Sequence, residues 1–270
     1  MNHLLLELAP ITEAGWLEIE KEARRTLKTT LAARKLVDFS GPLGWQTASV
    51  GTGRSDPPQA SPQSGVQARL RKVLPLVELR SVFTMLRSEL DAIDRGAKDP
   101  DTDPVIEAAR AIAIAEDRAV FHGYPPAGIR GICEGGGPIQ IGGAAADYPA
   151  LVANALTRLR DSGVDGPYAV ALSERCYTEL TEATDGGYPV LQHVRRLIDG
   201  PLVWAPGLDG AVVLSTRGED FELTVGQDFS IGYLDHDAER VRLYIEESFT
   251  FWLQSPQAAV PLAFPKATPG

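Results

Sequence analysis

The chain has 270 residues, of which 44% are hydrophobic and 23% are charged. This is an ordinary composition for a globular protein with a large core, folded as one elaborate domain or two. Its formal net charge of -10 argues against direct wrapping of nucleic acid, because such proteins present a basic face.

Cysteine and apolar runs indicate the compartment. Cys133 and Cys176 are the only cysteines, which predicts no disulfide framework and leaves a single bridge between them open. No apolar run reaches the roughly 18 residues of a membrane span, and no basic region precedes the short run at Leu4. We therefore expect a cytoplasmic protein with no membrane partner.

An amphipathic helix is predicted near the N-terminus. Thr12 is a suitable N-cap. Apolar residues then recur at steps of three and four, at Trp16, Ile19, Ala23, Leu27 and Leu31. The opposite face is charged, so one side packs against the protein and the other meets solvent or a partner.

Residues 45–80 are predicted to form an extended two-stranded arm. Its centre, GTGRSDPPQASPQSG, offers almost nothing to bury and should be a solvated tip. Beyond the tip, Val66, Ala68 and Leu70 alternate with polar residues, as in a strand. A two-stranded arm is marginally stable alone, so it is either a flexible hairpin on its own subunit or an arm laid over a neighbour.

A long helix is predicted from Asp103 to about Phe121, with Asp103 as its cap and Pro104 in its first turn. Its apolar surface is broad, which is typical of a helix buried almost all round.

Asp99, Asp101 and Asp103 alternate as in the first half of a calcium loop. Pro104 and Arg110 stand where that loop needs glycine and a bidentate glutamate, so no metal site is predicted.

Residues 135–217 alternate between helix and strand patterns and predict a compact α/β lobe. Helices are expected at 148–159, after Ser173 and at 193–198, and strands are expected at 168–172, 202–204 and 211–214. Between them, Gly186 and Gly187 predict a tight turn.

The chain is predicted to close with a half-buried antiparallel sheet. Between Phe221 and Leu253 the apolar residues fall on one parity, so one face meets a core and the other is wetter. Turn residues interrupt the pattern at 226–228 and 234–240. The Pro- and Ala-rich tail from Ser255 is expected to lie on the surface or to fray.

No catalytic motif is recognisable. HExxH, CxxC, GxSxG and Walker patterns are absent from the sequence. Cys176 and His193 could be a nucleophile and its base, but a structural thiol in a helix is the better interpretation. The absence of these motifs disfavours a conventional hydrolase or oxidoreductase, and we predict no cofactor.

Several motifs resemble the encapsulin shell proteins. They lie in the same order over nearly all of the chain: APITEAGWLEIEKEA, RKLVDFSGPLGW, ELDAIDRG, AEDRAVFHGY, GVDGPYAVALS, GYPV, GEDFELTVGQDFSIGY and VRLYIEESFTF. The resemblance implies an α+β fold of the tailed-bacteriophage major capsid protein (Hong Kong phage) type. It divides the chain into an N-terminal helix and the start of a peripheral domain (1–44), an extended E-loop (45–80), a peripheral domain with a spine helix (81–134), an axial domain (135–217), and a peripheral sheet with the C-terminal tail (218–270).

The resemblance also implies two functional surfaces. In encapsulins the N-terminal helix helps to form a groove that receives the C-terminal peptide of a cargo enzyme. The matching residues here are Leu31, Arg34, Asp38, Ile231 and Tyr233. The rim of the five-fold pore corresponds to Thr184, Asp185, Gly186, Gly187 and Tyr188. Repeated about an axis, Asp185 would form an acidic ring that favours cations.

Two positions depart from the better-known members of the family. Lys28 stands where they have an aromatic residue in the groove, which bears on peptide selectivity. Arg87 stands at the position of a tryptophan on which some encapsulins stack a flavin, so we predict no flavin.

The function implied by the resemblance is that of a self-assembling shell subunit, with about sixty copies in a closed icosahedral nanocompartment. The cargo would be a dye-decolorising peroxidase or a ferritin-like iron-storage protein, and the chemistry would belong to that cargo. The alternatives are a phage major capsid protein that packages a genome and, less favoured, a stand-alone hydrolase.

Overall fold

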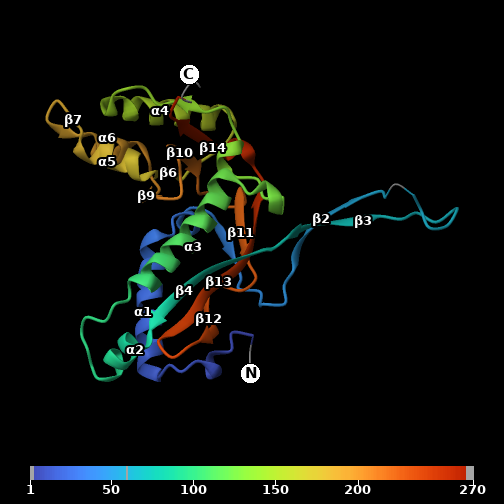
Figure 1. Ribbon diagram of the computed structural model, residues 1–270. Coiled ribbons are helices and arrows are strands. Elements are labelled where there is room, and N and C mark those ends of the chain that lie inside the picture. Colours follow the sequence, from blue (N-terminus) through green and yellow to red (C-terminus); the bar gives the residue numbers. More distant parts are fainter. Residues whose placement is uncertain (1–2, 59, 266–270) are drawn as a thin grey trace, which may run out of the picture.

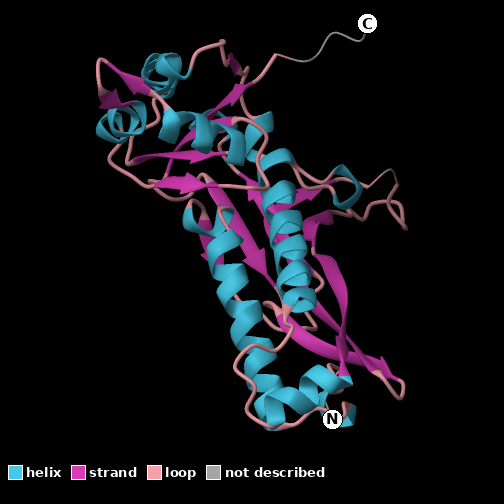
Figure 2. Cartoon of the chain, turned by 60° about the vertical axis from the view of Figure 1, so that its left-hand side comes forward, coloured by secondary structure: helices cyan, strands magenta, loops and turns pink. Residues whose placement is uncertain are grey.

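Two five-stranded β-sheets organise the chain, and a long arm projects from the side of the body (Figure 1). This computed structural model describes residues 3–58 and 60–265. Two long helices run side by side along one face of the first sheet, and shorter helices gather around the second sheet (Figure 2). The α+β architecture predicted from the sequence is confirmed.

The first sheet is built around its longest strand, β13 (Arg240–Leu253). Its other strands are β1 (Asp38–Ser40), β4 (Val77–Leu86), β11 (Phe221–Val225) and β12 (Ser230–His236). β11 and β12 pair with successive parts of β13 along one edge, and β4 pairs along the other. These pairings are antiparallel, whereas β1 joins β11 in parallel.

Helices α1 (Glu13–Thr30) and α3 (Asp103–His122) cover one face of the first sheet. Ile19 of α1, Ile112 of α3 and Leu243 of β13 are buried in the core that the helices share with the sheet. The alternation of apolar residues in the sequence therefore correctly identifies the face of the sheet that the helices cover.

The other face of β13 is drier than the sequence predicts. Tyr244 and Glu246 are buried there, at 3% and 2% exposure. Arg80 of β4 covers both, since its guanidinium lies 4.1 Å from the Tyr244 ring centroid and its Nη2 lies 2.7 Å from Glu246 Oε2. The long side chain of Arg80 on the neighbouring strand thus shields Tyr244 and Glu246 from water. The alternation of apolar residues along one strand cannot predict such a contact.

Local signals set where the long helices begin. The Thr12 hydroxyl accepts from the Gly15 amide at 3.2 Å, which confirms Thr12 as the N-cap of α1. The prediction that Asp103 caps α3 is wrong by one position, because Asp103 is already the first helical residue. Its amide donates to Asp101 Oδ1 at 3.0 Å. Pro104 in the first turn has no N–H to leave unpaired.

The second sheet is buried on both faces. Its strands, in order across the sheet, are β5 (Ile139–Gln140), β14 (Ala259–Ala263), β10 (Ala211–Ser215), β6 (Tyr168–Leu172) and β9 (Leu202–Trp204). Around it lie α4 (Tyr148–Asp161), α5 (Glu174–Glu182) and α6 (Val190–Leu197). Every residue of β6 and β10 is buried.

The expectation that the tail from Ser255 lies on the surface or frays is wrong for residues 258–262, which are buried. β14 pairs with β10 on one side and with β5 on the other. Ala259 and Val260 are buried, because their small and β-branched side chains fit between the flanking layers. Pro261, which a sequence reader takes as a sign of loop, lies opposite Val212 within the ladder. Residues 266–270 lie outside the described residues.

The arm, residues 49–75, consists of the antiparallel strands β2 (Ser49–Asp56) and β3 (Leu70–Pro75) and the tip between them. It extends far from the body (Figure 1). Several of its apolar side chains are exposed, among them Leu70 at 68% and Val73 at 50%. The extended arm predicted from the sequence is therefore present, with some of its apolar residues uncovered.

Short elements complete the chain. They are α2 (Arg87–Asp94), the hairpin of β7 (Thr184–Asp185) and β8 (Tyr188–Pro189), and 3₁₀ turns at Leu6–Leu8, Ala33–Lys35, Pro125–Ala127, Ile132–Glu134, Ala145–Asp147 and Pro256–Ala258. Both cysteines are free, so the single bridge left open by the sequence is not formed. Among the described residues, no helix has the length and apolar character needed to cross a membrane.

Candidate functional site

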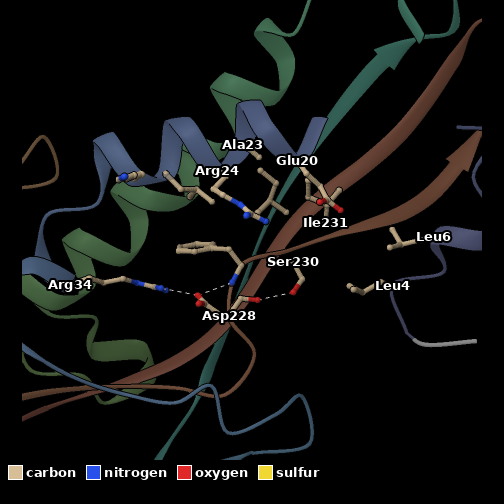
Figure 3. Close-up of a pocket in the computed structure, with 13 residues that line it drawn as sticks. Leu4, Leu6, Glu20, Ala23, Arg24, Arg34, Asp228, Ser230 and Ile231 are labelled. Carbon is tan, nitrogen blue, oxygen red and sulfur yellow. Dashed lines mark hydrogen bonds and ion pairs between the residues drawn. The ribbon is translucent and has the colours of Figure 1, made fainter. Parts of the chain in front are cut away.

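A groove of about 540 Å³ lies between α1, the start of β12 and the N-terminal segment, residues 3–8 (Figure 3). Apolar side chains from all three elements form much of its surface, and charged side chains lie along α1 and at one end. The lining residues are Leu4, Leu6, Glu20, Ala23, Arg24, Leu27, Lys28, Arg34, Asp228, Phe229, Ser230, Ile231 and Ile245.

Contacts at His3 and Leu4 hold the N-terminal segment against the first sheet. The Tyr233 amide donates to the Leu4 carbonyl at 2.9 Å. The His3 ring stacks on Trp45 with centroids 4.3 Å apart, and His3 Nε2 lies 3.1 Å from Glu246 Oε1. The apolar side chains of this segment thereby become a wall of the groove.

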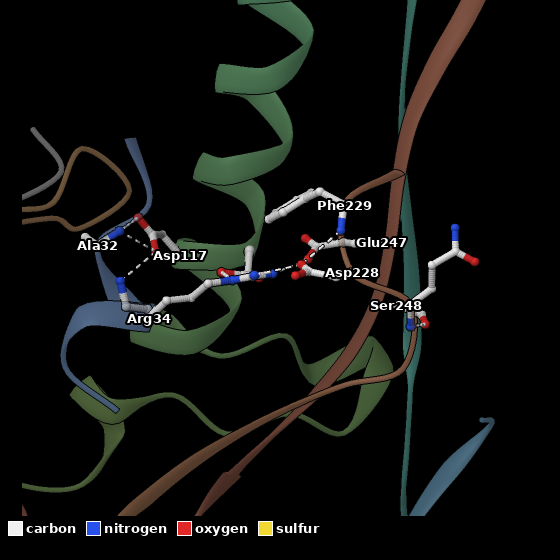
Figure 4. Close-up of polar contacts among 10 residues, drawn as sticks. Ala32, Arg34, Asp117, Asp228, Phe229, Glu247 and Ser248 are labelled. Carbon is white, nitrogen blue, oxygen red and sulfur yellow. Dashed lines mark hydrogen bonds and ion pairs between the residues drawn. The ribbon is translucent and has the colours of Figure 1, made fainter. Parts of the chain in front are cut away.

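Arg34 is held at one end of the groove by three carboxylates, which we call the Arg34 cluster: Arg34, Glu116, Asp228 and Glu247 (Figure 4). Its Nε donates to Glu116 Oε2 at 2.9 Å, Nη1 to Asp228 Oδ1 at 2.8 Å, and Nη2 to Glu247 Oε2 at 3.1 Å. The guanidinium also lies 4.5 Å from the Phe229 ring centroid. Since Nη2 bonds Glu116 as well, one Nη1 hydrogen is left for a ligand.

The electrostatics of the Arg34 cluster follow from burial. Burial disfavours the charge on Arg34, but the hydrogen bond and charge of Glu116, with the charges of Glu247 and Asp228, outweigh it and raise the pKa of Arg34. Burial and then the neighbouring Glu116 raise the pKa of Glu247 well above the ordinary glutamate value. Arg34 therefore already compensates buried carboxylates before any ligand arrives.

Asp117 shapes the turn that brings Arg34 to the groove. It is fully buried, and its carboxylate accepts from the Ala32 amide at 3.0 Å and from the Ala33 amide at 2.8 Å (Figure 4). Burial raises the pKa of Asp117 to about 7, although the two amides favour the charged form. This anchor to α3 fixes the chain just after α1, where Arg34 follows.

The structure brings only some of the sequence-predicted groove residues together. Arg34 and Ile231 line the groove. Leu31 is buried at the end of α1, at 8% exposure. Tyr233 lies beside the groove, where its amide contacts Leu4.

Asp38 does not lie in the groove. Its carboxylate accepts from the Glu219 amide at 2.6 Å in a separate hollow beside Lys35 and Gly218. The reason is that Asp38 opens β1, and the parallel pairing of β1 with β11 carries it away from β12. Asp38 is thus absent from the residues that line the groove.

Sequence reasoning missed several residues of the groove. Leu4 and Leu6 belong to the apolar run that was weighed only as part of a signal peptide. Asp228 lies in a stretch interpreted as a turn, yet it completes the Arg34 cluster. Arg24 lines the groove from the charged side of α1. The amphipathic pattern of α1 could have indicated Arg24; no sequence signal marks Asp228.

The predicted pore residues form the tip of an exposed hairpin. Thr184 and Asp185 make β7, Tyr188 begins β8, and Asp185 pairs with Tyr188. Gly186 and Gly187 have positive φ angles of 56° and 84°, which glycine adopts without strain. The Tyr188 ring packs on His193 with centroids 4.8 Å apart.

The cysteines do not have the environment of nucleophiles. Burial raises the pKa of the Cys176 thiol, so it stays neutral and poorly reactive. His193, its imagined base, packs on Tyr188 instead. Burial raises the pKa of Cys133 to about 12.

Comparisons with known proteins bear on the fold and the family of the chain. A family model described as "Encapsulating protein for peroxidase" matches residues 1–250. The chain is 58% identical over 270 residues to a type 1 encapsulin shell protein of Rhodospirillum rubrum, covering 97% of this chain and 96% of that protein. It is 48% identical over 265 residues to that of Mycobacterium tuberculosis, covering 97% and 100%.

Solved structures show the same fold at low identity. A virus-like particle from Pyrococcus furiosus aligns with a TM-score of 0.64 and 15% identity over 91% of this chain and 98% of that chain. A chain of Mycobacterium phage Bobi aligns with a TM-score of 0.59 and 12% identity over 90% and 91%. The capsid fold of the Hong Kong phage type predicted from the sequence is confirmed. The relatives are structural shell proteins rather than catalysts, and the chain belongs to the encapsulin shell-protein family.

Proposed function

We propose that this chain, a shell subunit that self-assembles into a large homo-oligomer, forms a closed icosahedral container of about sixty copies around a cargo enzyme. The groove between α1 and β12 receives the C-terminal peptide of that cargo. The cargo is a dye-decolorising peroxidase or a ferritin-like iron-storage protein, and the loaded shell works in the cytoplasm. The description of the matching family, an encapsulating protein for peroxidase, supports the first of these.

The groove is the observation that carries this proposal. Ala23 and Leu27 of α1 face Ile231 of β12 across a hollow of about 540 Å³, which offers apolar contact to an extended peptide. Arg24 and Lys28 add positive charge at the α1 wall, in a chain with a formal net charge of -10. Arg34 can add one N–H from its end of the groove.

A loading assay tests the groove. The shell gene is co-expressed with a fluorescent protein that carries the C-terminal peptide of the co-encoded cargo, and particles are separated by size exclusion. Leu27→Ala removes apolar contact from the groove, so we expect at least tenfold less fluorescence per particle. Leu17→Ala is the matched control, because Leu17 lies on the same helix at 61% exposure and does not line the groove.

Particles of Leu27→Ala that load as well as those of Leu17→Ala would remove the groove from the proposal. Genomic nucleic acid inside purified particles would instead favour the phage-capsid alternative, which the net charge of -10 disfavours.

The β7–β8 hairpin is proposed to line the pore at the five-fold axis. Five copies of Asp185 around an axis would lower the free energy of a passing cation. Asp185→Lys should slow entry of ferrous iron into shells loaded with a ferritin-like cargo and leave particle size unchanged. Unchanged iron uptake would place the pore elsewhere.

A further inference from the structure

The outer edge of β12 runs along the groove and can offer backbone hydrogen bonds in addition to side-chain contacts. β12 is the last strand in the order β1-β11-β13-β12, so only one of its two edges pairs within the sheet. The other edge runs along the groove, where Ser230 and Ile231 belong to the lining (Figure 3).

The register of β12 shows which backbone groups point to that edge. The Tyr233 amide donates to Leu4, which lies outside the sheet, so Tyr233 faces away from β13. Bonded and non-bonded positions alternate along an antiparallel pair. The pairs Ile231↔Ile245 and Tyr233↔Leu243 are two positions apart with no register shift between them. The N–H and C=O of Ile231 therefore face the same free edge as Tyr233.

The opposite strand gives an independent check of this parity. Ser248 of β13 donates its amide to Gln227 and accepts from the Gly226 amide, both of which precede β12. The even-numbered residues of β13 thus point toward the β12 side, and Ile245 does not. Within residues 3–58 and 60–265, no neighbouring segment makes a backbone hydrogen bond to Ile231.

The N-terminal segment meets this edge at one backbone hydrogen bond and then turns away from it. It bonds Tyr233 through Leu4, but Leu5 then takes a left-handed conformation with φ 54°, and the chain turns into the 3₁₀ helix at Leu6. The bulge of β12 lies beyond Tyr233, so it does not shield Ile231. Soluble proteins usually cover or charge such an edge, which makes an open position inside an apolar groove informative.

We propose that the groove binds its peptide by strand addition: an extended segment hydrogen-bonds through its backbone to Ile231, in line with Leu4 on the same edge. This inference rests on the proposed function and names how the site recognises its partner. The peptide carries apolar side chains at alternate positions, which face Ala23 and Leu27, and it has no proline at the position that pairs with Ile231.

An N-methyl scan of the peptide tests strand addition. The probe is a fluorescein-labelled synthetic peptide copied from the C-terminus of the co-encoded cargo protein, bound to assembled wild-type shells and followed by anisotropy. Each variant carries one N-methyl group. Methylation of the one amide that donates to the Ile231 carbonyl should weaken binding at least tenfold, whereas methylation of the two neighbouring amides should be tolerated within threefold.

The pattern of results separates the two proposals. Binding of the parent peptide that no single N-methyl group weakens tenfold overturns strand addition and leaves the groove as a cargo site. Failure of the parent peptide to bind overturns the proposed function and strand addition together.

A pair of shell variants tests the same contact from the protein side. Ile231→Ala keeps the backbone N–H, whereas Ile231→Pro removes it at a position that β13 does not use. Both should assemble, and Ile231→Pro should bind the probe at least tenfold more weakly than Ile231→Ala. Equal affinities of two assembled variants would overturn strand addition; if the Pro variant does not assemble, the N-methyl scan decides.

Discussion

The Arg34 cluster and the arm differ in whether their side chains are buried within one subunit. In the Arg34 cluster, Glu116 and Glu247 are fully buried and Arg34 binds both, so these charged groups pair within one subunit. In the arm, Leu70 and Val73 are exposed and cover nothing. The cluster should therefore matter to the folding of a single subunit, and the arm should matter to what a subunit does with its neighbours.

The strongest test of this comparison is to remove the Arg34 side chain. Arg34→Ala would leave two buried carboxylates without their cation, and we expect a loss of about 3–5 kcal/mol in the free energy of unfolding. Urea denaturation followed by tryptophan fluorescence measures it. Arg24→Ala is the control, since Arg24 lines the same groove and forms no ion pair among the described residues; it should change stability by less than about 0.5 kcal/mol.

A change within about 1 kcal/mol for Arg34→Ala would show that the cluster is not needed for folding. This result also affects cargo experiments, because a loading defect in an Arg34 variant would mix instability with lost recognition. Leu27 is the cleaner position for that purpose.

The arm should show the reverse behaviour. Leu70→Asp with Val73→Asp places charge where a neighbouring copy would cover apolar surface, so we expect particle yield to fall at least a hundredfold. The subunit should keep its circular dichroism and its urea midpoint, because neither side chain is buried. Gln63→Asp at the tip is the control. Normal particles from the double variant would mean that the arm lies in solvent.

The pH dependence of folding sharpens the role of the buried acids. The folded-state pKa of Asp117, about 7, lies above its ordinary value of 3.8, so the folded chain holds a proton between these values. The contribution of Asp117 is complete below about pH 4 and is lost as pH rises through about 7. Asp117→Asn should lessen the fall in unfolding free energy between pH 5 and pH 8 by about 2 kcal/mol.

Parallel pH profiles of the two proteins would contradict this assignment. Because other carboxylates titrate over the same range, only the difference between the profiles of wild type and Asp117→Asn is interpreted.

The hairpin tip should give the smallest effect. Gly187→Ala forces a side chain into a positive φ of 84°, at a cost of about 1 kcal/mol. Nothing lies near the added methyl group, so the strain stays local. Hydrogen exchange should quicken at residues 184–189 and stay unchanged in β13. Gly137→Ala, at ordinary φ and also in open space, serves as the control.

Sequence reasoning succeeds where a pattern is local and periodic. The cap at Thr12, the helical face of Ile19 and Ala23, and the parity of β13 are all readable, because a helix or strand repeats its environment at a fixed step. The arm can be predicted for a different reason, because its tip has almost no apolar side chains to bury. The continuous apolar run of β6 likewise marks a strand buried on both faces.

It fails where a contact joins distant segments. Arg80 of β4 covers Tyr244 of the adjacent strand β13, and no periodicity in the sequence pairs these two residues. Asp228 sits in a turn-like stretch and contacts Arg34, which is 194 positions away. Asp38 shows that a match by motif does not give a direction in space, because the parallel pairing of β1 carries it out of the groove.

The place of β14 inside its sheet has a consequence for synthesis. β14 lies between β5 and β10, yet it is translated after every other strand of its sheet. On the ribosome, β10 and β5 must wait with unpaired edges until Ala259–Ala263 emerges. A prematurely terminated chain would therefore lack the strand that closes this lobe, and the growing container would be supplied only with subunits whose translation had passed that point.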